Sequence, residues 1–124
     1  MNNLQGNFGN INYKAPEMFL NQPYNGIMTD VFSLGQILIN IAGGIFGFKS
    51  ARQNDDYYRL IIEQHFDQYW FEIGKKHNLI LSQDFQNLFI RMVSPNPAQR
   101  PTIEQILNDP WMQEINDLNE EQKK

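Results

Sequence analysis

GNINYKAPE, residues 9 to 17, is the stretch that decides how this chain folds. Its proline, Pro16, disfavours helix at Ala15, because the pyrrolidine ring crowds the backbone of the preceding residue. The stretch therefore predicts a loop that turns into a short helix over residues 17 to 20. Three further informative stretches follow it in order: DVFSLG at residues 30 to 35, PAQRPT at residues 97 to 102 and PWM at residues 110 to 112.

Taken together, the four stretches resemble motifs of the serine/threonine protein kinase catalytic domain. The first is similar to the end of the activation segment, G-T-x-x-Y-x-A-P-E, and the second to the D-x-W-S-x-G start of the central helix. The third and fourth are similar to the arginine-containing loop and the final helix of the same lobe. The resemblance spans residues 9 to 113 in family order and spacing. It implies a partial kinase domain, the C-terminal lobe, over residues 1 to 113 and a polar tail over residues 114 to 124.

The nucleotide-binding and catalytic motifs of the family are absent from this sequence. A complete kinase domain carries a glycine-rich loop, a strand lysine, a catalytic loop of the H-R-D-x-x-x-x-N type and a metal-binding D-F-G. Asn7-Phe8-Gly9 resembles a degenerate D-F-G but abuts the Ala-Pro-Glu triplet, so Gly9 is better interpreted as the glycine before Tyr13. We therefore expect no catalytic residue, cofactor site or metal site in this chain. The resemblance implies ATP and Mg for a complete parent kinase.

Composition favours a globular protein of the cytoplasm or nucleus. Of the 124 residues, 41% are hydrophobic, which is enough for the core of one domain. The net charge of −4 argues against nucleic-acid binding, which usually needs a basic face. The absence of cysteine excludes disulfides, cysteine metal sites and a thiol nucleophile. No signal peptide is visible, and the most apolar stretch, residues 31 to 48, falls short of the ~20 apolar residues of a membrane span.

Helical patterns fill the chain and no strand pattern is found, so the predicted fold class is all-α. A central helix is expected from a cap at Thr29 or Asp30 to about Ala42, where two glycines stop it. Apolar residues lie on nearly every side of this helix, which predicts that it is buried all round. In the family, a long helix that this sequence lacks covers its far side. We therefore expect large side chains of the far side to be uncovered: Phe32, Leu38 and Ile39.

Three more helices are predicted to pack on the central one. The first begins at the Asn54-Asp55-Asp56 cap and ends near Phe66, and residues 69 to 71 (Tyr-Trp-Phe) follow as an aromatic anchor in a connection. The second begins at Ser82, and its apolar residues recur at the spacing of one buried face: Phe85, Leu88, Phe89 and Met92. The third carries a capping box of Thr102 and Gln105 and ends at Asp109-Pro110. Trp111 is expected to fold back onto the core, and the tail from Asn116 to fray.

Glu17 and Arg100 are predicted to support the substrate loop. In the family, the glutamate of the Ala-Pro-Glu triplet pairs with the arginine before the last helix, so the resemblance implies a partly buried ion pair here. Without it, both residues would be interpreted as surface charges that contribute little. Asp30 has two compatible roles, as a local helix cap and, by resemblance, as an acceptor for a catalytic loop that this sequence lacks.

By resemblance, Asn10, Asn12, Tyr13 and Lys14 belong to the loop that receives the residue after the phosphoacceptor. Asn10 stands where the family usually has a threonine, whose hydroxyl bridges the catalytic aspartate and lysine. A carboxamide cannot donate and accept at one atom, so reduced activity is expected even in an intact parent. Arginine-directed members often carry carboxylates at the positions of Asn12 and Asn40. Both are neutral here, so a basic-substrate preference through this pair is not supported.

Three hypotheses follow for the function. The first is part of a serine/threonine kinase, which transfers the γ-phosphoryl of ATP to protein, inactive as this chain alone. The second is a degenerate, pseudokinase-like lobe that docks a protein partner through the second helix. The third is an unrelated helical domain with chance motifs. The expected partners are a protein substrate or docking partner and the missing kinase segments, with no nucleic acid and no membrane. His65 and His77 are interpreted as surface residues rather than metal ligands.

Overall fold

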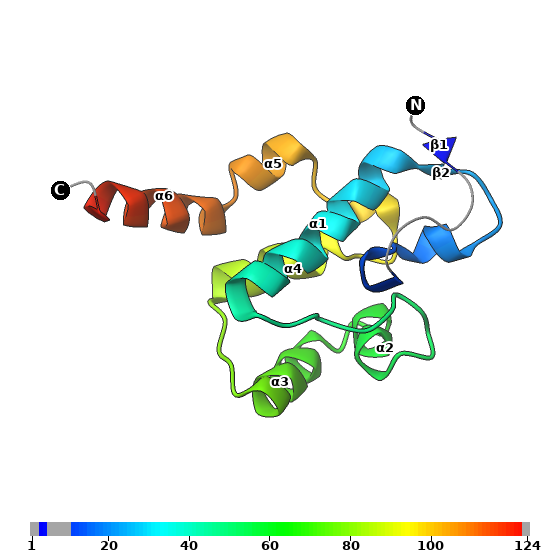
Figure 1. Cartoon of the computed structure of the whole chain (residues 1–124), viewed down its shortest axis with the longest axis horizontal. Helices are drawn as coiled ribbons and strands as arrows, with labels where there is room; N and C mark the ends of the chain where they lie inside the picture. Colours follow the sequence, from blue (N-terminus) through cyan, green and yellow to red (C-terminus); the bar gives the residue numbers. More distant parts are fainter. Residues whose placement is uncertain (1–2, 5–10, 123–124) are drawn as a thin grey trace.

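The computed structural model describes residues 3–4 and 11–122, and these residues are mostly helical (Figure 1). The helical prediction is confirmed, although a short antiparallel pair of two-residue strands was not predicted: β1 (Asn3–Leu4) and β2 (Tyr24–Asn25). The α-helices are α1 (Gly26–Gly43), α2 (Asp56–Ile62), α3 (Phe66–His77), α4 (Gln83–Met92), α5 (Ile103–Leu107) and α6 (Pro110–Gln122). Three short 3-10 helices complete the described elements: η1 (Ile11–Tyr13), η2 (Pro16–Phe19) and η3 (Pro97–Gln99).

The central helix α1 begins earlier than predicted because Asn25 caps it. The Asn25 carboxamide oxygen accepts hydrogen bonds from two backbone amides of the first turn, at 2.9 and 3.3 Å. Thr29 and Asp30 therefore lie inside the helix, and the prediction that one of them caps it is wrong. The Thr29 hydroxyl instead donates to the Gly26 carbonyl at 2.8 Å. The predicted stop is confirmed, since Gly44 ends the helix in the left-handed conformation with φ 69°.

One face of α1 is buried and the other is not. On the buried face, Phe32 and Ile39 are completely covered and Leu38 packs against the core, so the prediction that these three would lie uncovered is wrong. On the opposite face, Ile37 and Ile41 are 41% and 75% exposed, and the expected burial all round is therefore also wrong. Among the described residues, α1 is long and apolar enough to pass as a membrane span by length and composition. Its position across α4 in the centre of the fold (Figure 1) favours a core helix.

The region after α2 contains a helix that was not predicted. Asp55 caps α2, as expected for its acidic cluster, and accepts two amides of the first turn at 3.0 and 2.9 Å. Gln64 then turns the chain with a positive φ of 61°, and α3 begins at Phe66. The aromatic residues 69 to 71 therefore lie within a helix and not in a connection. They anchor as expected, because Tyr69 is fully buried and its ring stacks 6.3 Å from that of Phe89.

Helices α4 and α5 begin as predicted. The Ser82 hydroxyl accepts the Phe85 amide at 3.2 Å, and all four predicted core residues of α4 are buried. The capping box of α5 has both of its bonds, between Thr102 and Gln105, at 3.1 and 2.9 Å. These two helix starts follow from local side-chain chemistry, which explains why the sequence was sufficient to find them.

The predicted end of α5 is confirmed, because the helix closes at Leu107 with Asn108 as its C-cap, but a further helix that was not predicted follows it. Asp109 accepts the Trp111 amide at 2.9 Å and so starts α6, which runs to Gln122. The tail expected to fray from Asn116 is thus helical. Trp111 packs edge-on against Phe85 with ring centroids 4.9 Å apart, as predicted. Figure 1 shows α5 and α6 extending to one side of the core formed by α1 and α4.

Candidate functional site

A buried ion pair joins η2 to the loop that follows η3. Arg100 donates from Nη1 to Oε2 of Glu17 at 2.6 Å and from Nη2 to Oε1 at 2.8 Å, across 83 positions of sequence. The Arg100 side chain has no exposed surface, and that of Glu17 is 12% exposed. Two parallel bonds match the guanidinium fork to the carboxylate, which is the strongest common form of such a pair.

The remaining donors of Arg100 bind backbone carbonyls. Its Nε donates to the Ser94 carbonyl at 2.9 Å, and its Nη1 donates to the Met28 carbonyl at 2.9 Å. The guanidinium also lies 5.1 Å from the centroid of the Phe32 ring on α1. Arg100 therefore ties η2, the first turn of α1 and the loop before η3 to one point, with its buried charge compensated.

Polar side chains of α1 hold η1. The buried carboxamide of Gln36 donates to the Asn12 carbonyl at 2.8 Å and to the Phe48 carbonyl at 3.1 Å. Its oxygen accepts the Gly47 amide at 3.0 Å. The Ser33 hydroxyl donates to the Tyr13 carbonyl of η1 at 2.7 Å. Gln36 and Ser33 thus fix η1 and the loop after α1 against the central helix.

Most of the predicted substrate-loop residues lie in or next to η1. Asn12 donates from Nδ2 to the Lys49 carbonyl at 3.1 Å. The Tyr13 ring meets Phe46 edge-on with centroids 5.5 Å apart. Lys14 follows, with its Nζ 5.8 Å from the ring centroid of Phe19. Asn10 lies outside the described residues.

The structure does not group all predicted residues into one site. Asp30 is exposed on α1 and is not among the described groups that bind Arg100. Asn40 donates to the Ile45 carbonyl at 3.4 Å, so it and Asn12 bind backbone carbonyls at different points of the loop after α1. Within residues 3–4 and 11–122, no three His, Asp or Glu side chains are grouped so as to hold a metal ion.

Sequence reasoning missed Gln36 and Ser33 as supports of η1. A signal was present, because both are polar residues within the most apolar stretch of the chain. A buried polar side chain must find partners, and here the partners are the backbone of two loops. Their identity could not be read from the sequence, since nothing local indicates which loop lies against α1.

The loop after α1 is packed as closely as it is hydrogen-bonded. A Cβ added at Gly47 would lie 2.7 Å from both the Phe89 ring and the Tyr69 hydroxyl. That hydroxyl donates to the Gly47 carbonyl at 2.8 Å, and burial raises the pKa of Tyr69 well above its usual value. Tyr69 therefore remains a protonated donor, and only glycine fits opposite it.

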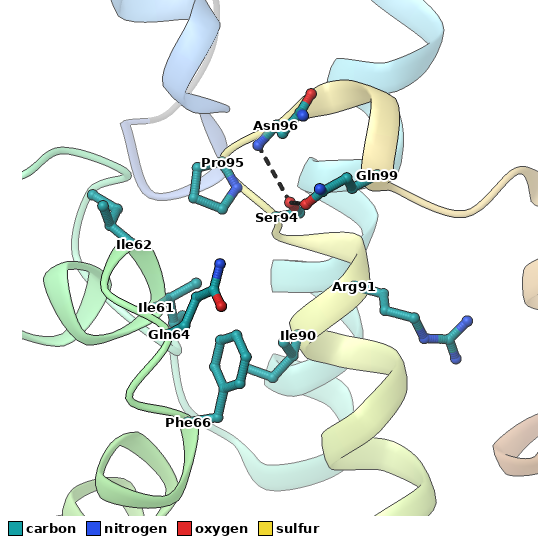
Figure 2. Close-up of a pocket in the computed structure, with 10 residues that line it drawn as sticks. All are labelled: Ile61, Ile62, Gln64, Phe66, Ile90, Arg91, Ser94, Pro95, Asn96 and Gln99. Atoms are coloured by element: carbon teal, nitrogen blue, oxygen red, sulfur yellow. Dashed lines mark hydrogen bonds between the residues drawn. The ribbon is translucent and has the colours of Figure 1, made fainter.

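Two open cavities border α2. One, of about 910 Å³, is bounded by η1, the loop after α1, the start of α2 and the end of α3. The other, of about 520 Å³, lies between the α2–α3 connection and the end of α4. Figure 2 shows Gln64 and Phe66 on one side of this second cavity facing Ile90 and Pro95, while Arg91 points away. Arg91 forms an ion pair with Asp109.

Comparison with known proteins gives consistent matches to kinases. The family described as Protein kinase domain matches residues 1–112. The chain is 32% identical over 103 residues to CBL-interacting serine/threonine-protein kinase 26 of Arabidopsis thaliana, covering 83% of this chain and 21% of that protein. It is 34% identical over 103 residues to CBL-interacting protein kinase 31 of Oryza sativa subsp. japonica, with 83% and 21% covered. It is 29% identical over 119 residues to calcium/calmodulin-dependent protein kinase cmkA of Emericella nidulans, with 90% and 25% covered. The chain spans about a fifth of the length of the first two relatives.

Proposed function

The chain belongs to the protein kinase family, and from that premise we propose that residues 1 to 113 form the helical C-terminal lobe of a serine/threonine kinase catalytic domain. In a complete domain this lobe holds the loop that receives the protein substrate. ATP and Mg are bound by segments whose motifs this sequence does not contain. The 124-residue chain alone transfers no phosphoryl group.

The observation that carries the proposal is the continuous set of contacts from Arg100 to η1. Arg100 holds Glu17 at the end of the Ala-Pro-Glu triplet and contacts Phe32 on α1. From the same helix, Gln36 holds the carbonyl of Asn12. Catalysis of phosphoryl transfer depends mainly on positioning, so a substrate loop fixed from two sides is the contribution that this lobe would make.

The uncovered face of α1 supports the proposal that further kinase segments pack on this lobe. Ile37 and Ile41 lie four positions apart on one helix stripe and are 41% and 75% exposed. Apolar stripes of this kind mark interfaces more often than free surface. We propose that the remainder of the catalytic domain covers this stripe in the parent kinase.

A second candidate is a docking module that has lost catalysis. It is favoured by the cavity next to α2 (Figure 2), whose rim includes Ile62, 36% exposed. In this reading the lobe binds a protein partner and the substrate loop has no catalytic use. Activity of an assembled domain discriminates the two candidates.

A chimera tests the proposal. The segment of the Arabidopsis relative that matches this chain is replaced by the corresponding residues of this chain, and phosphorylation of generic serine peptides is measured. The lobe proposal expects an active chimera that loses activity when it carries Arg100→Met. A folded chimera that binds ATP yet has no activity would favour the docking module.

A further inference from the structure

We propose that the cavity of about 910 Å³ beside η1 binds carboxylate side chains of an extended peptide, so that the lobe selects acidic protein substrates. This inference rests on the function proposed above, because it names the class of substrate that the same loop receives. The cavity borders η1 directly, through Ile11 and Asn12. A peptide bound against the substrate loop would therefore pass through it.

Three cations line this cavity, and none of them forms an ion pair with a carboxylate of the described residues. They are Lys49, Arg52 and Lys76. In the described ranges, the ion pairs involve other cations, namely Arg59, Arg91 and Arg100. Arg52 lies 4.7 Å from the Phe19 ring centroid and donates to the Ser50 hydroxyl at 3.4 Å. Lys76 lies 4.9 Å from the ring centroid of Tyr57. These partners are neutral, so the positive charges are not cancelled.

Two carboxylates, Asp55 and Asp56, line the same cavity. Asp55 accepts four backbone amides, two from the first turn of α2 and two from Lys49 and Ser50, at 2.9 to 3.2 Å. Asp56 pairs with Arg59 at 3.3 Å. Neutral amides leave the charge of Asp55 in place, so the charged side chains of the lining are three cations and two carboxylates, and the described lining has a net positive charge. Because the whole chain has a net charge of −4, this local excess does not follow from overall composition.

The cations extend toward the predicted substrate loop. Lys14 and Arg52 both lie near the Phe19 ring, at 5.8 and 4.7 Å from its centroid. Next to them, Ile11 and Phe46 are 43% and 37% exposed and supply an apolar wall for a peptide. Such a surface complements an extended peptide with carboxylates and repels a basic one.

Binding of matched peptides to the full 124-residue chain tests the inference. Labelled peptides of about ten residues carry one serine flanked by Glu, by Gln or by Lys, and affinity is measured by fluorescence anisotropy. We expect the Glu peptide to bind about tenfold more tightly than the Gln peptide at low salt. The difference should shrink between about 0.05 and 0.3 M salt because exposed charges are screened. Equal affinity for the Glu and Gln peptides would overturn the inference.

Neighbouring lysines of α3 provide a matched control. Lys76→Met and Arg52→Met should each weaken binding of the Glu peptide about three- to tenfold and leave the Gln peptide unchanged. Lys76→Arg, which keeps the charge, should bind like the parent chain. Lys75 is exposed on the same helix but does not line the cavity, so Lys75→Met should have no effect. An equal loss in Lys75→Met and Lys76→Met would refute a specific site. Melting curves check that each variant is folded.

The chimera separates this inference from the proposed function. An active chimera with the same KM for Glu and Gln peptides would contradict acidic selection and leave the proposed function intact. An inactive chimera, together with charge-dependent peptide binding by the 124-residue chain, would contradict the proposed function and retain the acidic peptide site.

Discussion

Replacing Arg100 should destabilise the fold more than replacing Glu17, because Arg100 makes hydrogen bonds to the Ser94 and Met28 carbonyls in addition to those with Glu17. Arg100→Met strands the Glu17 carboxylate and removes the donor to the carbonyls of Ser94 and Met28. Each buried acceptor left unsatisfied costs about 1–3 kcal/mol. Glu17 can recover some hydration, since it is 12% exposed. The expected total is near ~5 kcal/mol, at the upper end of the range for breaking a buried pair.

Glu17→Gln leaves a different defect. The guanidinium stays completely buried but keeps its two carbonyl acceptors, and the new carboxamide oxygen can accept one bond. The expected loss is therefore about 3 kcal/mol, the lower end of the same range. The two replacements remove the same interaction, so the double variant should be less damaged than their sum by about 2 kcal/mol.

Urea unfolding followed by circular dichroism measures this cycle. Where Arg100→Met unfolds the chain outright, Arg100→Lys keeps the charge but loses the fork and gives the same cycle in milder form. Glu104→Gln, an exposed carboxylate on α5, is the control and should change the free energy of unfolding by less than about 0.5 kcal/mol. Additivity of the two single effects within about 0.5 kcal/mol would refute the coupling, as would a larger loss for Glu17→Gln than for Arg100→Met.

Further outcomes are expected elsewhere in the molecule. Gln36→Leu removes three hydrogen bonds to backbone and should cost at least ~3 kcal/mol in a urea melt; a loss under ~1 kcal/mol would contradict its role. Gly47→Ala should cost about 1–3 kcal/mol, since its methyl group would overlap the Phe89 ring and the Tyr69 hydroxyl, and an unchanged melt would show that the loop can shift. Calorimetric titration of the 124-residue chain should show no Mg-dependent ATP binding, and stoichiometric binding at micromolar affinity would contradict this. Replacing both Ile37 and Ile41 by Gln should reduce self-association and dye binding without destabilising the fold, whereas a loss typical of core residues would show that the stripe is covered.

Local chemistry explains which helices could be predicted from the sequence. Ser82 and the Thr102–Gln105 box each place a side chain against amides of its own helix, so the start is specified within a few residues. The start of α3 has no capping side chain to indicate it. Its N-cap residue, His65, makes no side-chain hydrogen bond to the described amides of the first turn. The helix spacing of Tyr69, Trp70 and Ile73 was nevertheless available. It was missed because the aromatic run was interpreted as an anchor.

Competition between caps explains the error at α1. Asn25, Thr29 and Asp30 are all good capping residues, and propensity alone does not choose among them. The choice is made by the short strand pair that ends at Asn25, in which Tyr24 is 5% exposed and pairs with Leu4, so that the chain enters the helix earlier. This is a tertiary constraint on a local signal, and the sequence pattern of residues 26 to 30 does not contain it.

The contact between Glu17 and Arg100 could be anticipated only through the family resemblance. No sequence period relates two residues 83 positions apart, and each residue alone would be interpreted as an ordinary surface charge. The supports of η1 needed a further step, since the resemblance named the substrate loop but not the side chains beneath it. Gln36 could have been suspected because a carboxamide within an apolar helix must either face solvent or bind backbone. Because α1 crosses the centre of the fold, Gln36 binds backbone. Its carboxamide lies on the buried face of α1 and donates to the Asn12 and Phe48 carbonyls.

The two faces of α1 give the two proposals different surfaces: one for the selection of acidic peptides and one for assembly of the catalytic domain. The face that bears Ser33 and Gln36 holds η1, and the cavity with Lys49, Arg52 and Lys76 lies beyond it on the same side. The stripe that includes Ile41 is on the other face, where we propose that the remaining kinase segments pack. Peptide recognition and completion of the catalytic domain therefore use different surfaces of one helix. Variants of the stripe should change assembly of the domain without changing the preference for acidic peptides, and variants of the cations should do the reverse.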